Sequence, residues 1–519
     1  MRRKIPVAKA AVTPKTLRAL LDGLAGCQVL GDVDVPVTGV AYHSREVTPG
    51  GIFVALKGCR TDGHLYLAAS LNQGARVVVT EQELAPPPGV TVVRAPKARL
   101  ALAHISAAFY DHPSREMTLV GITGTNGKTS TTYLLEAILS AAGCRVGVVG
   151  TVNYRVGEST WPAPVTTPES LDLQRLLREM RTRGATHVFL EVSSHALDLR
   201  RVDGAVFAAA VFTNLSQDHL DYHRDLNEYF AAKARLFLEI LANGRPSGGG
   251  LAVLNLDDPR GQELKDAVLV PALTYGLHPE SLVRPLSYRF RQDGLEARLT
   301  TPAGEVEITS RLVGPFNLAN ILAAAATALG LGIDPDTVAR GIAALPGVPG
   351  RLERFGPPAG PGVFVDYAHT PEAITQALAA LQTLKFSRLI TVFGCGGDRD
   401  RTKRPLMGQA AAAGSQLVIV TSDNPRTEDP LAIIGESEPG LKKSGRPRLD
   451  AAAAQRGEAG YLVVPDRREA IRLAVALARP GEAVLVAGKG HENYQIWGTQ
   501  RRHFDDREEV AQALTEYHG

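Results

Sequence analysis

Short apolar runs recur along the chain, and most of them end in glycine or in charged residues. In the middle of the chain such runs lie at 119–123, 187–192 and 208–213, with segments of helical character between them. Strands that alternate with helices in this way form βαβ units around a parallel sheet. The pattern therefore predicts an α/β protein whose ligands bind at the carboxyl ends of the strands.

The same alternation divides the chain into three regions. A segment at 111–114 reads as a linker after the first region, and a hinge rich in proline and glycine at 345–350 precedes the third. A chain of 519 residues also exceeds what one hydrophobic core usually serves. We therefore expect a small N-terminal α/β domain at 1–115, a central parallel-sheet domain at 116–345 and a Rossmann-like C-terminal domain at 346–519.

Local signals place several elements within these regions. The β-rich stretches of the first region are 51–56, 76–80 and 90–94. In the second region, Thr167, Pro168 and Glu169 predict an N-cap, a first-turn proline and an acidic first turn for a helix that ends near Arg183.

The third region contains four strand–loop units. Their strands are expected at 363–367, 389–394, 417–421 and 484–487. In a Rossmann-like sheet the loops after these strands would stand on one edge and form a charged pocket. Residues 436–460 are rich in Gly, Pro, Lys and Ala, and we expect a helix fragment followed by a mobile loop there.

Composition narrows the classes of partner. Fifty-seven basic and 54 acidic side chains leave a net charge of +3, without a long block of one sign, which disfavours nucleic acid and anionic membranes as partners. The four cysteines show neither a CxxC pair nor metal-ligand spacing. No secretory signal and no apolar run near the roughly 20 residues of a membrane helix occurs. We expect small-molecule substrates, a cytoplasmic location and a monomer.

A glycine-rich loop between a strand and a helix is the strongest chemical signal. It consists of Gly124, Thr125, Asn126, Gly127, Lys128, Thr129 and Ser130. Backbone N–H groups of such a loop and the N-terminus of the next helix bind phosphate, the lysine adds charge, and the hydroxyl after it can ligate Mg²⁺. Ile122 stands where the usual P-loop has a further glycine, so the loop is a shorter relative of that motif. An ordinary turn with a surface lysine is the alternative.

Three ionisable residues have both a functional and a structural interpretation. Lys233 shares a helix face with Phe230 and Phe237, where loss of water would lower the pKa of its amine, although a lysine extending from a half-buried helix fits the same pattern. Glu191 lies near a strand end and could form a structural salt bridge. His219 could belong to a helix cap.

Taken together and in order, the motifs identify a family resemblance. They are GTNGKTS, TTPES, EVSSHAL, DHLDYH, AKARLF, NLDD, GPFNLAN, GRLE, DYAHTP, GCGGDRD, DNPR and GKGHE. A chain with this set resembles the Mur ligases, the ATP-dependent amino-acid-adding enzymes of peptidoglycan synthesis, over residues 40–510. The resemblance implies a UDP-substrate-binding first domain, an ATP-binding second domain, an amino-acid-binding third domain, and a reaction that activates a carboxylate as an acyl phosphate.

The resemblance also implies roles for individual residues around ATP. Thr129 and Glu191 would hold metal-bound phosphate oxygens, directly or through water, and Lys128 would offset the negative charge on the transferred phosphoryl group. His219 would help to bind a second Mg²⁺, and Lys233 would carry CO₂ as a carbamate that helps to place Mg²⁺. Further ATP contacts are implied for Asn255, Asp257, Asn317, Asn320, Arg351, Asp366 and His369. Asn255 and Asp257 fit a turn equally well.

For the UDP-linked peptide the resemblance implies contacts in the first two domains. They involve Ser44, Arg45, Cys59, Arg60, Thr61, Thr166, Thr167, Ser193 and Arg201. The chain departs from the family at His43, where many relatives have an acidic residue, and at Leu199, where some have glutamine. A hydroxyl that bonds to its own backbone is the alternative for Ser193.

The amino acid to be added would bind in the third domain. The family's pocket corresponds to Arg399, Asp423, Asn424, Pro425, Arg426, Gly488 and Glu492. A DNPR motif is typical of members that add meso-diaminopimelate to UDP-N-acetylmuramoyl-L-alanyl-D-glutamate, because the planar fork of Arg426 can bind the second carboxylate that lysine lacks. By itself DNPR is more often a turn with a surface arginine.

Other functions stay open at this point. A lysine-adding ligase or a folylpolyglutamate synthetase of the same superfamily is the nearest alternative, opposed by DNPR and by the first domain respectively. A nucleotide-gated binding module lacks support because the guanine signature Asn-Lys-x-Asp does not occur. Retention of Lys128, Glu191, His219 and Lys233 argues against a silent paralogue. We also expect a closing motion about the hinge at 345–350.

Overall fold

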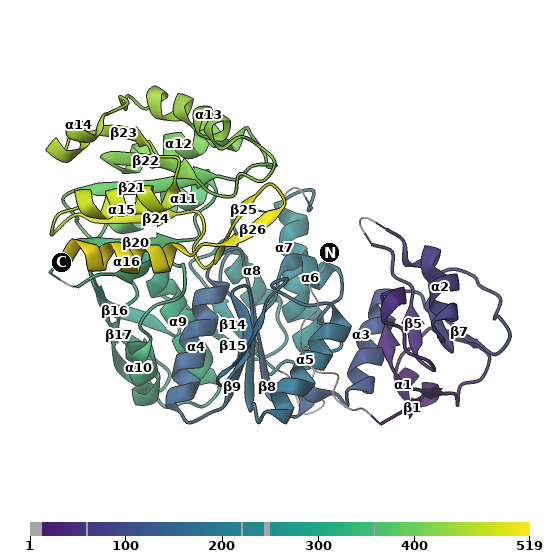
Figure 1. Cartoon of the computed structure of the whole chain (residues 1–519). Coiled ribbons are helices and arrows are strands. Elements are labelled where there is room, and N and C mark those ends of the chain that lie inside the picture. Colours follow the sequence, from purple (N-terminus) through teal and green to yellow (C-terminus); the bar gives the residue numbers. More distant parts are fainter. Residues whose placement is uncertain (1–12, 59–60, 219–221, 243–249, 358, 519) are drawn as a thin grey trace. The chain divides into compact units, whose positions relative to one another are not determined.

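The computed structural model describes residues 13–58, 61–218, 222–242, 250–357 and 359–518 (Figure 1). Its contacts divide the chain into two compact units. Unit 1 runs to Arg284 and includes Thr300–Gly304 and Asn320–Gly341. Unit 2 comprises Pro285–Leu299, Glu305–Ala319 and Ile342–Gly519.

The first sheet of unit 1 belongs to the N-terminal region. Its strands, in spatial order, are β2 (Gln28–Leu30), β7 (Thr91–Arg94), β6 (Val77–Thr80), β5 (Ile52–Val54) and β4 (Val40–Ala41), and all neighbours but β2 and β7 are parallel. Nearby elements are β1 (Lys15–Thr16), β3 (Pro36–Val37), α1 (Leu17–Leu21), η1 (Ser44–Glu46), η2 (Gly63–Tyr66), α2 (Leu67–Asn72) and α3 (Ala98–Phe109). The three β-rich stretches are thus strands, as predicted.

An eight-stranded sheet forms the centre of unit 1. Its spatial order is β11 (Ser159–Pro162), β10 (Asn153–Val156), β9 (Val146–Val149), β12 (His187–Glu191), β8 (Thr118–Thr123), β13 (Ala209–Phe212), β14 (Leu251–Asn255) and β15 (Ala272–Tyr275). From β9 to β15 all neighbours are parallel, and β10 with β11 adds an antiparallel edge. The carboxyl ends of β8, β12 and β13 therefore lie at one edge, as predicted.

Helices complete this domain. They are η3 (Pro113–Arg115), α4 (Lys128–Ala141), α5 (Ser170–Thr182), α6 (Ser194–Asp198), α7 (Leu226–Arg235), the π-helical turn η4 (Leu236–Leu241) and α8 (Pro259–Ala267). The predicted N-cap of α5 is wrong: Glu169 caps the helix by accepting the N–H of Ser170 at 3.2 Å. The Thr167 hydroxyl instead donates to the carbonyl oxygen of Glu191, 2.8 Å away, so this side chain links the loop to the strand end.

Unit 2 contains a six-stranded sheet. Its order is β19 (Glu353–Phe355), β20 (Gly362–Asp366), β24 (Ala483–Ala487), β21 (Leu389–Cys395), β22 (Leu417–Ser422) and β23 (Gly460–Val463). All pairs except β19 with β20 are parallel. The four predicted strands are adjacent, and their loops leave from one edge, which confirms the Rossmann-like arrangement.

The sheet of unit 2 is accompanied by helices and a hairpin. They are α11 (Pro371–Gln382), α12 (Lys403–Gly414), α13 (Pro430–Lys443), α14 (Ala451–Arg456), α15 (Arg467–Leu477), α16 (Asp506–His518) and the strands β25 (Tyr494–Trp497) and β26 (Gln500–His503). The helix fragment predicted within 436–460 is confirmed, because α13 continues to Lys443. The loop predicted after it is shorter than expected, because it ends where α14 begins at Ala451, and β23 follows.

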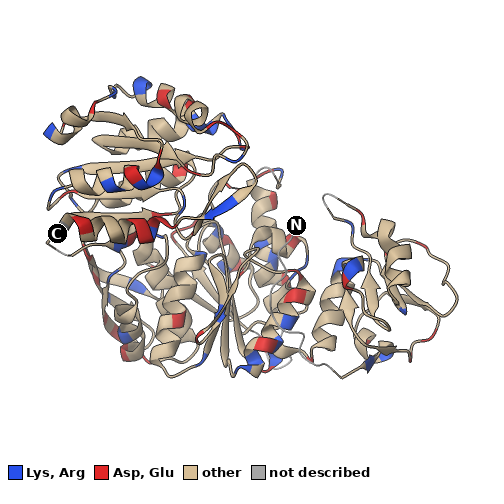
Figure 2. Cartoon of the chain, in the orientation of Figure 1, with Lys and Arg blue, Asp and Glu red and all other residues tan. Residues whose placement is uncertain are grey.

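A three-stranded sheet was not foreseen from the sequence. It consists of β16 (Arg284–Arg291), β17 (Gly294–Thr301) and β18 (Gly304–Ser310), and the helices α9 (Pro315–Gly330) and α10 (Pro335–Ala344) follow. Basic and acidic side chains are interspersed along the helices (Figure 2), in keeping with the near balance of charge. In the described part of the chain, every helix is too short or too polar to cross a membrane.

Candidate active site

The glycine-rich loop joins β8 to α4, and both of its glycines have positive φ angles. Gly124 has φ +146° and Gly127 has φ +86°. A Cβ at Gly124 would overlap the Thr213 hydroxyl, and one at Gly127 would overlap the side-chain oxygen of Asn320. Because α4 begins directly after Gly127, the positive end of its helix dipole lies at the loop, which suits an anion.

Residues at the end of β13 brace this loop. The side-chain oxygen of Asn214 accepts the N–H of Asn126 at 2.9 Å, and its carbonyl accepts the N–H of Thr125 at 2.9 Å. The Thr213 hydroxyl donates to the carbonyl of Asn126 at 2.6 Å. Lys128 donates to the carbonyls of Gly124 and Thr125, both at 2.8 Å, so its ammonium group lies over the loop.

Glu191 is a buried carboxylate at the end of β12, with 1% of its surface exposed. One of its oxygens accepts the hydroxyls of Thr129 at 3.1 Å and Thr151 at 2.8 Å, and the other accepts the N–H of Thr151 at 3.1 Å. Within the described residues no lysine, arginine or histidine forms an ion pair with Glu191, which disfavours the structural salt bridge. A cluster of three or more His, Cys, Asp or Glu is likewise absent from the described residues.

Lys233 is buried on α7, with 1% of its surface exposed. Its ammonium nitrogen donates to the carbonyl of Gly124 at 2.9 Å and lies 4.4 Å from the ring centre of Tyr229. Burial lowers the pKa of Lys233 well below its ordinary value, and the charge of Lys128 acts in the same direction against that of Asp218. The lowered pKa agrees with the burial that the Phe230 and Phe237 pattern predicted, and the contact with Gly124 places the amine beside the glycine-rich loop.

A second group of polar residues lies around the loop that precedes α5. The Ser193 N–H donates to the Thr167 hydroxyl at 3.1 Å, and the Ser193 hydroxyl caps α6 at the N–H of Ala196. Arg201 donates to the carbonyl of Thr167 at 3.1 Å and lies 3.6 Å from Glu169. The Thr166 hydroxyl is 3.1 Å from that of Thr151. Thr166, Thr167, Ser193 and Arg201 are therefore brought together.

The N-terminal candidates are partly described. Ser44 is buried at the start of η1, and His43 caps this turn by accepting the N–H of Arg45 at Nδ1, 3.3 Å away. The histidine thus fills the capping role that an acidic residue could also fill. The Thr61 hydroxyl donates to Tyr66 at 3.3 Å. The predicted site residues Cys59, Arg60 and His219 lie outside the described residues.

The predicted ATP contacts fall into different surroundings. Asn255 donates to the carbonyl of Thr213 at 2.7 Å, so it touches the brace of the phosphate loop. Asp257 accepts the N–H groups of Leu277 and His278, both at 2.8 Å, which is the turn-forming role. Two further candidates are buried on α9: Asn320 lies against Gly127, and Asn317 donates to the carbonyl of Val313 at 2.9 Å.

Three more of these residues lie in unit 2, at the end of β20. The guanidinium of Arg351 lies 5.1 Å from the ring centre of Tyr367, and His369 contacts the carbonyl of Tyr367 at 2.8 Å. Burial raises the pKa of the Asp366 carboxyl, although the charge of Arg351 opposes the shift. Burial and the charge of Arg351 lower the pKa of the neighbouring His491 to about 4, so that ring is neutral at pH 7.

The loops after β22 and β24 form a charged cluster that we call the polar edge: Asp423, Asn424, Arg426, Lys489 and Glu492. Lys489 is fully buried, and its ammonium nitrogen lies 3.4 Å from Asp423, 3.4 Å from the side-chain oxygen of Asn424 and 3.5 Å from Glu492. Asn424 donates to Glu492 at 3.3 Å. Gly488 has φ +122°, and a Cβ there would lie 3.1 Å from Asp423.

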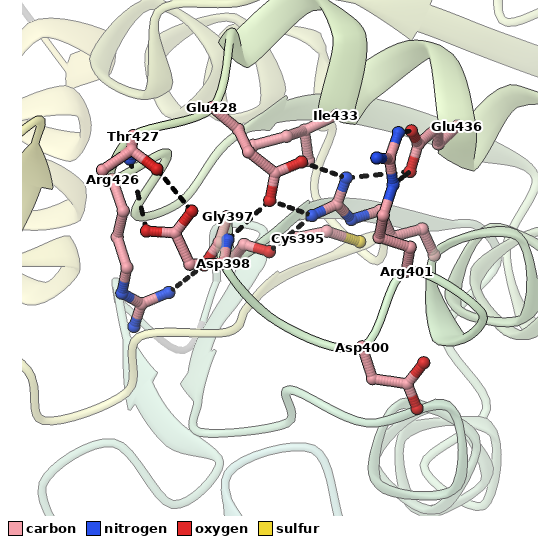
Figure 3. A network of polar contacts seen from close by, with 12 residues as sticks. Cys395, Gly397, Asp398, Asp400, Arg401, Arg426, Thr427, Glu428, Ile433 and Glu436 are labelled. Atoms are coloured by element: carbon pink, nitrogen blue, oxygen red, sulfur yellow. Dashed lines mark hydrogen bonds and ion pairs between the residues drawn. The ribbon is translucent and has the colours of Figure 1, made fainter.

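Arg426 completes the polar edge in a strained backbone conformation, with φ +52°. Its N–H donates to the carbonyl of Ile496 at 3.0 Å, and its guanidinium donates to the carbonyl of Gly397 (Figure 3). Pro425 is buried beside Gly397, whereas Arg399 is exposed and its Cγ lies near Gly396. All the pocket residues predicted in unit 2 therefore lie on the loops after β21, β22 and β24.

Three residues that contact the glycine-rich loop, Glu191 or the carboxylates of the polar edge were not predicted from the sequence. Asn214 and Thr151 bind the phosphate loop and Glu191, and Lys489 joins the two carboxylates of the polar edge. Each follows a strand at an edge that had been recognised, so position along the sheet was the available signal. Their residue types alone do not distinguish them from turn residues.

Comparison with known proteins supports one family for the whole chain. The family described as "Mur ligase middle domain" matches residues 122–328, "Mur ligase, glutamate ligase domain" matches 350–490, and "Mur ligase family, catalytic domain" matches 36–110. The three matched segments confirm the prediction of three α/β domains. The exact boundaries at 115 and 345 stay predictions.

Similar whole proteins agree with this assignment. The UDP-N-acetylmuramoyl-L-alanyl-D-glutamate--2,6-diaminopimelate ligases of Geobacter metallireducens and Geobacter sulfurreducens are 51% and 48% identical to this chain, over 94% of it and 96% of each relative. A solved structure of a ligase with the same name has 33% identity and a TM-score of 0.72, covering 98% of this chain and 100% of that one. The chain therefore belongs to the Mur ligase family.

Proposed function

We propose that this chain is an ATP-dependent ligase that joins meso-diaminopimelate to the D-glutamate of UDP-N-acetylmuramoyl-L-alanyl-D-glutamate in peptidoglycan precursor synthesis. The observation that carries the proposal is the polar edge, where Asp423 and Glu492 flank the buried ammonium group of Lys489 and Arg426 lies on the same loop as Asp423, at the carboxyl ends of parallel strands. Such a set of charges is complementary to an amino acid with a second carboxylate. The other substrate, UDP-N-acetylmuramoyl-L-alanyl-D-glutamate, is proposed from the names of the relatives.

The chemistry requires that a carboxylate become reactive toward an amine. A D-glutamate oxygen attacks the γ-phosphorus of ATP, the bond to ADP breaks, and the acyl phosphate then loses phosphate when the amine forms the amide and releases a proton. The loop from Gly124 to Ser130 would hold the phosphates through its N–H groups and the N-terminus of α4. Lys128 would stabilise the negative charge that develops on the transferred group.

The donor set around Glu191 fits Mg²⁺. A carboxylate and the Thr129 hydroxyl are hard oxygen ligands, and the buried Glu191 has hydroxyl and amide donors but no cationic partner among the described residues. Glu191 and Thr129 would hold the ion, together with His219, which we propose on family resemblance alone. When bound, Mg²⁺ offsets the negative charge of the phosphate oxygens.

Lys233 is proposed to carry CO₂. Its uncharged nitrogen can form an N–C bond to CO₂ and lose a proton, so that a cation becomes an anionic carbamate. The lowered pKa of Lys233 favours the reactive amine, and its position beside the carbonyl of Gly124 places the group at the phosphate loop. A carbamate would then add oxygen ligands for the metal.

Recognition of the amine would rest on the polar edge. We assign the distal carboxylate of diaminopimelate to the fork of Arg426 and its ammonium group to Asp423 and Glu492. Because Lys489 offsets one of these two negative charges, the three groups together carry one net negative charge, which matches one ammonium. Lysine lacks the distal carboxylate and would leave Arg426 unpaired.

The remaining assignments are proposals of the same kind. The UDP-linked peptide would contact Ser44, Cys59, Arg60, Thr61, Thr166, Thr167, Ser193 and Arg201, with ATP contacts at Asn255, Asp257, Asn317, Asn320, Arg351, Asp366 and His369. Arg399, Asn424, Pro425 and Gly488 would complete the diaminopimelate pocket. A monomer that acts in the cytoplasm fits the substrates, which are small polar molecules.

The test is ADP release by the purified protein with Mg²⁺, ATP, CO₂ and the UDP-linked dipeptide. Meso-diaminopimelate, L-lysine and no amine are compared. We expect release with diaminopimelate alone. Release with lysine would replace the proposal by a lysine-adding ligase. If no ADP is released with either amine, the proposed ligase activity or its assigned UDP substrate is refuted. Nucleotide binding without turnover would favour the gated binding module.

A further inference from the structure

Two loops of unit 2 are joined by a network of polar contacts that the proposed reaction does not use. The network links the loop after β21 to the loop after β22 that carries Arg426 (Figure 3). The carboxylate of Asp398 accepts the hydroxyl of Thr427 at 2.6 Å and its N–H at 3.4 Å. In return, the N–H of Asp398 donates to Glu428 at 2.5 Å. The residues that follow Arg426 are thus held to the neighbouring loop.

Glycines make this close approach possible. A Cβ at Gly397 would overlap the carbonyl oxygen of Pro425, the residue before Arg426, and a Cβ at Gly396 would lie 3.0 Å from the guanidinium of Arg426. The two loops are therefore in direct contact at Pro425 and at the side chain of Arg426. The glycines provide space, and the polar contacts provide attraction.

Arg404 anchors the network from helix α12. It is 1% exposed, and its two terminal nitrogens donate to the two oxygens of Glu428 at 2.7 and 3.0 Å. It also donates to the carbonyl of Gly396 at 3.2 Å and to Glu436 on α13 at 2.8 Å. A bidentate pair of this kind fixes both orientation and distance. Arg404 thereby connects a rigid helix to both loops at once.

The conformation of Arg426 needs such support. A non-glycine residue with φ +52° lies in a sparsely populated region and keeps it only when the surroundings hold it there. On one side the hairpin β25–β26 binds its backbone, through the N–H of Arg426 to Ile496 and the N–H of Gly498 to the Arg426 carbonyl at 2.7 Å. On the other side, Thr427 and Glu428 are bound to the loop after β21 and to Arg404.

We propose that Arg404 and Glu428 are positioning residues that clamp the Arg426 loop in the conformation in which its guanidinium selects diaminopimelate over lysine. The inference rests on the proposed function and adds to it the groups that set selectivity from outside the pocket. Neither residue touches the substrate in this scheme. Loss of the clamp should relax the loop and move the fork of Arg426, while the phosphate loop in unit 1 keeps its own braces.

Glu436 offers a matched control. Glu436 lies on α13 and pairs with Arg404 and with Arg401. It does not contact Pro425 or Thr427, the two residues beside Arg426. Glu428→Gln and Glu436→Gln each remove one negative charge from the same network. If the clamp sets the preference for diaminopimelate over lysine, Glu428→Gln should change that preference and Glu436→Gln should not.

The experiment measures kcat and KM for ATP, the UDP-linked dipeptide and diaminopimelate, together with turnover on L-lysine. For Glu428→Gln we expect the KM for diaminopimelate to rise about tenfold or more, since a charged bidentate contact is lost. The KM values for the other two substrates should stay within about twofold, and the preference for diaminopimelate over lysine should fall. Glu436→Gln should resemble the wild type in all four quantities.

A double variant separates positioning from stability. Arg404→Met with Glu428→Met replaces the pair by apolar side chains, which commonly keeps or restores stability. A clamp predicts that its KM for diaminopimelate stays raised even where its unfolding temperature equals that of the wild type. An unchanged KM for diaminopimelate in Glu428→Gln, an equal rise for all three substrates, or an equal rise in Glu436→Gln would overturn the proposal. Absence of diaminopimelate turnover in the wild type itself would instead refute the proposed function.

Discussion

At the scale of single residues, burial of Lys233 links the fold to pH. Its folded pKa lies below its unfolded one, so the unfolded chain binds more protons between the two values and stability rises with pH across that window. Lys233→Met removes this dependence. We expect the free energy of unfolding of the variant to exceed that of the wild type most at low pH, with the difference shrinking toward the ordinary pKa of lysine, roughly 10.4.

Denaturant unfolding of both proteins at several pH values measures this difference. The variant also loses the hydrogen bond from Lys233 to the carbonyl of Gly124, 2.9 Å long, which shifts all of its values by a similar amount. The slope of the difference against pH is therefore the informative quantity. A difference that does not change with pH would show that Lys233 titrates alike in both states.

Arg426 tests recognition of the amino acid. Arg426→Ala should raise the KM for diaminopimelate by about 10- to 100-fold, the cost of a lost charge-assisted contact, and leave the KM for ATP near that of the wild type. Arg426→Lys keeps the charge but loses the planar fork, so an intermediate KM is expected. Steady-state kinetics with each substrate varied in turn gives both values. Unchanged kinetics in the alanine variant would refute the assignment.

The sequence revealed some of these residues and not others, for physical reasons. Lys233 could be predicted as buried because Phe230 and Phe237 mark its face of the helix. Burial of Lys489 could not be predicted, because it depends on two carboxylates. Asp423 lies on another loop, and Glu492 lies three residues after Lys489. Hydrophobic periodicity reports which face is buried, but contacts between loops depend on the sheet order.

At the scale of elements, helix α13 holds two glycines with opposite surroundings. A Cβ at Gly435 would meet nothing within 4 Å, whereas a Cβ at Gly440 would overlap the carbonyl oxygen of Pro405 on α12. Gly435→Ala should therefore stabilise the protein by about 0.5–1 kcal/mol through helix propensity. Gly440→Ala should destabilise it by about 1–3 kcal/mol, because α12 and α13 must separate. Thermal unfolding of both variants checks the contrast, and equal shifts would contradict it.

The same helix explains why the loop predicted within 436–460 is shorter than expected. Pro439 and the glycines of the segment read as loop signals, yet Gly440 permits close approach to α12, and Gly408 on α12 does the same for the carbonyl of Ser437. Packing between the two helices thus overrides local propensity. Strands β8, β12 and β13 of the first large sheet and β20, β21, β22 and β24 of the second were predicted because their apolar runs are continuous. Strands β14, β15 and β23 were not predicted, and β16–β18 form a sheet with one exposed strand and a weak pattern.

At the scale of the whole molecule, the phosphate loop belongs to unit 1 and the polar edge to unit 2. Amide formation needs the activated carboxyl and the amine within bonding distance, so we expect substrates to change the arrangement of the two units. Residues 345–350, predicted from the sequence as the hinge, lie within unit 2, just after the chain passes from unit 1 to unit 2 at 341–342. Small-angle scattering with an ATP analogue and the UDP-linked dipeptide, together and singly, measures this change. Curves identical to those of the free protein would count against a closing motion.

The central claim is that the protein forms an amide through a carboxylate activated by ATP. The most direct test uses the UDP-linked dipeptide with ¹⁸O in the acceptor carboxylate of D-glutamate, together with ATP and meso-diaminopimelate. Mass spectrometry then follows the phosphate and the peptide product. An acyl phosphate predicts one ¹⁸O transferred to phosphate for each amide formed, and none without diaminopimelate. Phosphate without ¹⁸O, or ADP release without amide, would contradict the account.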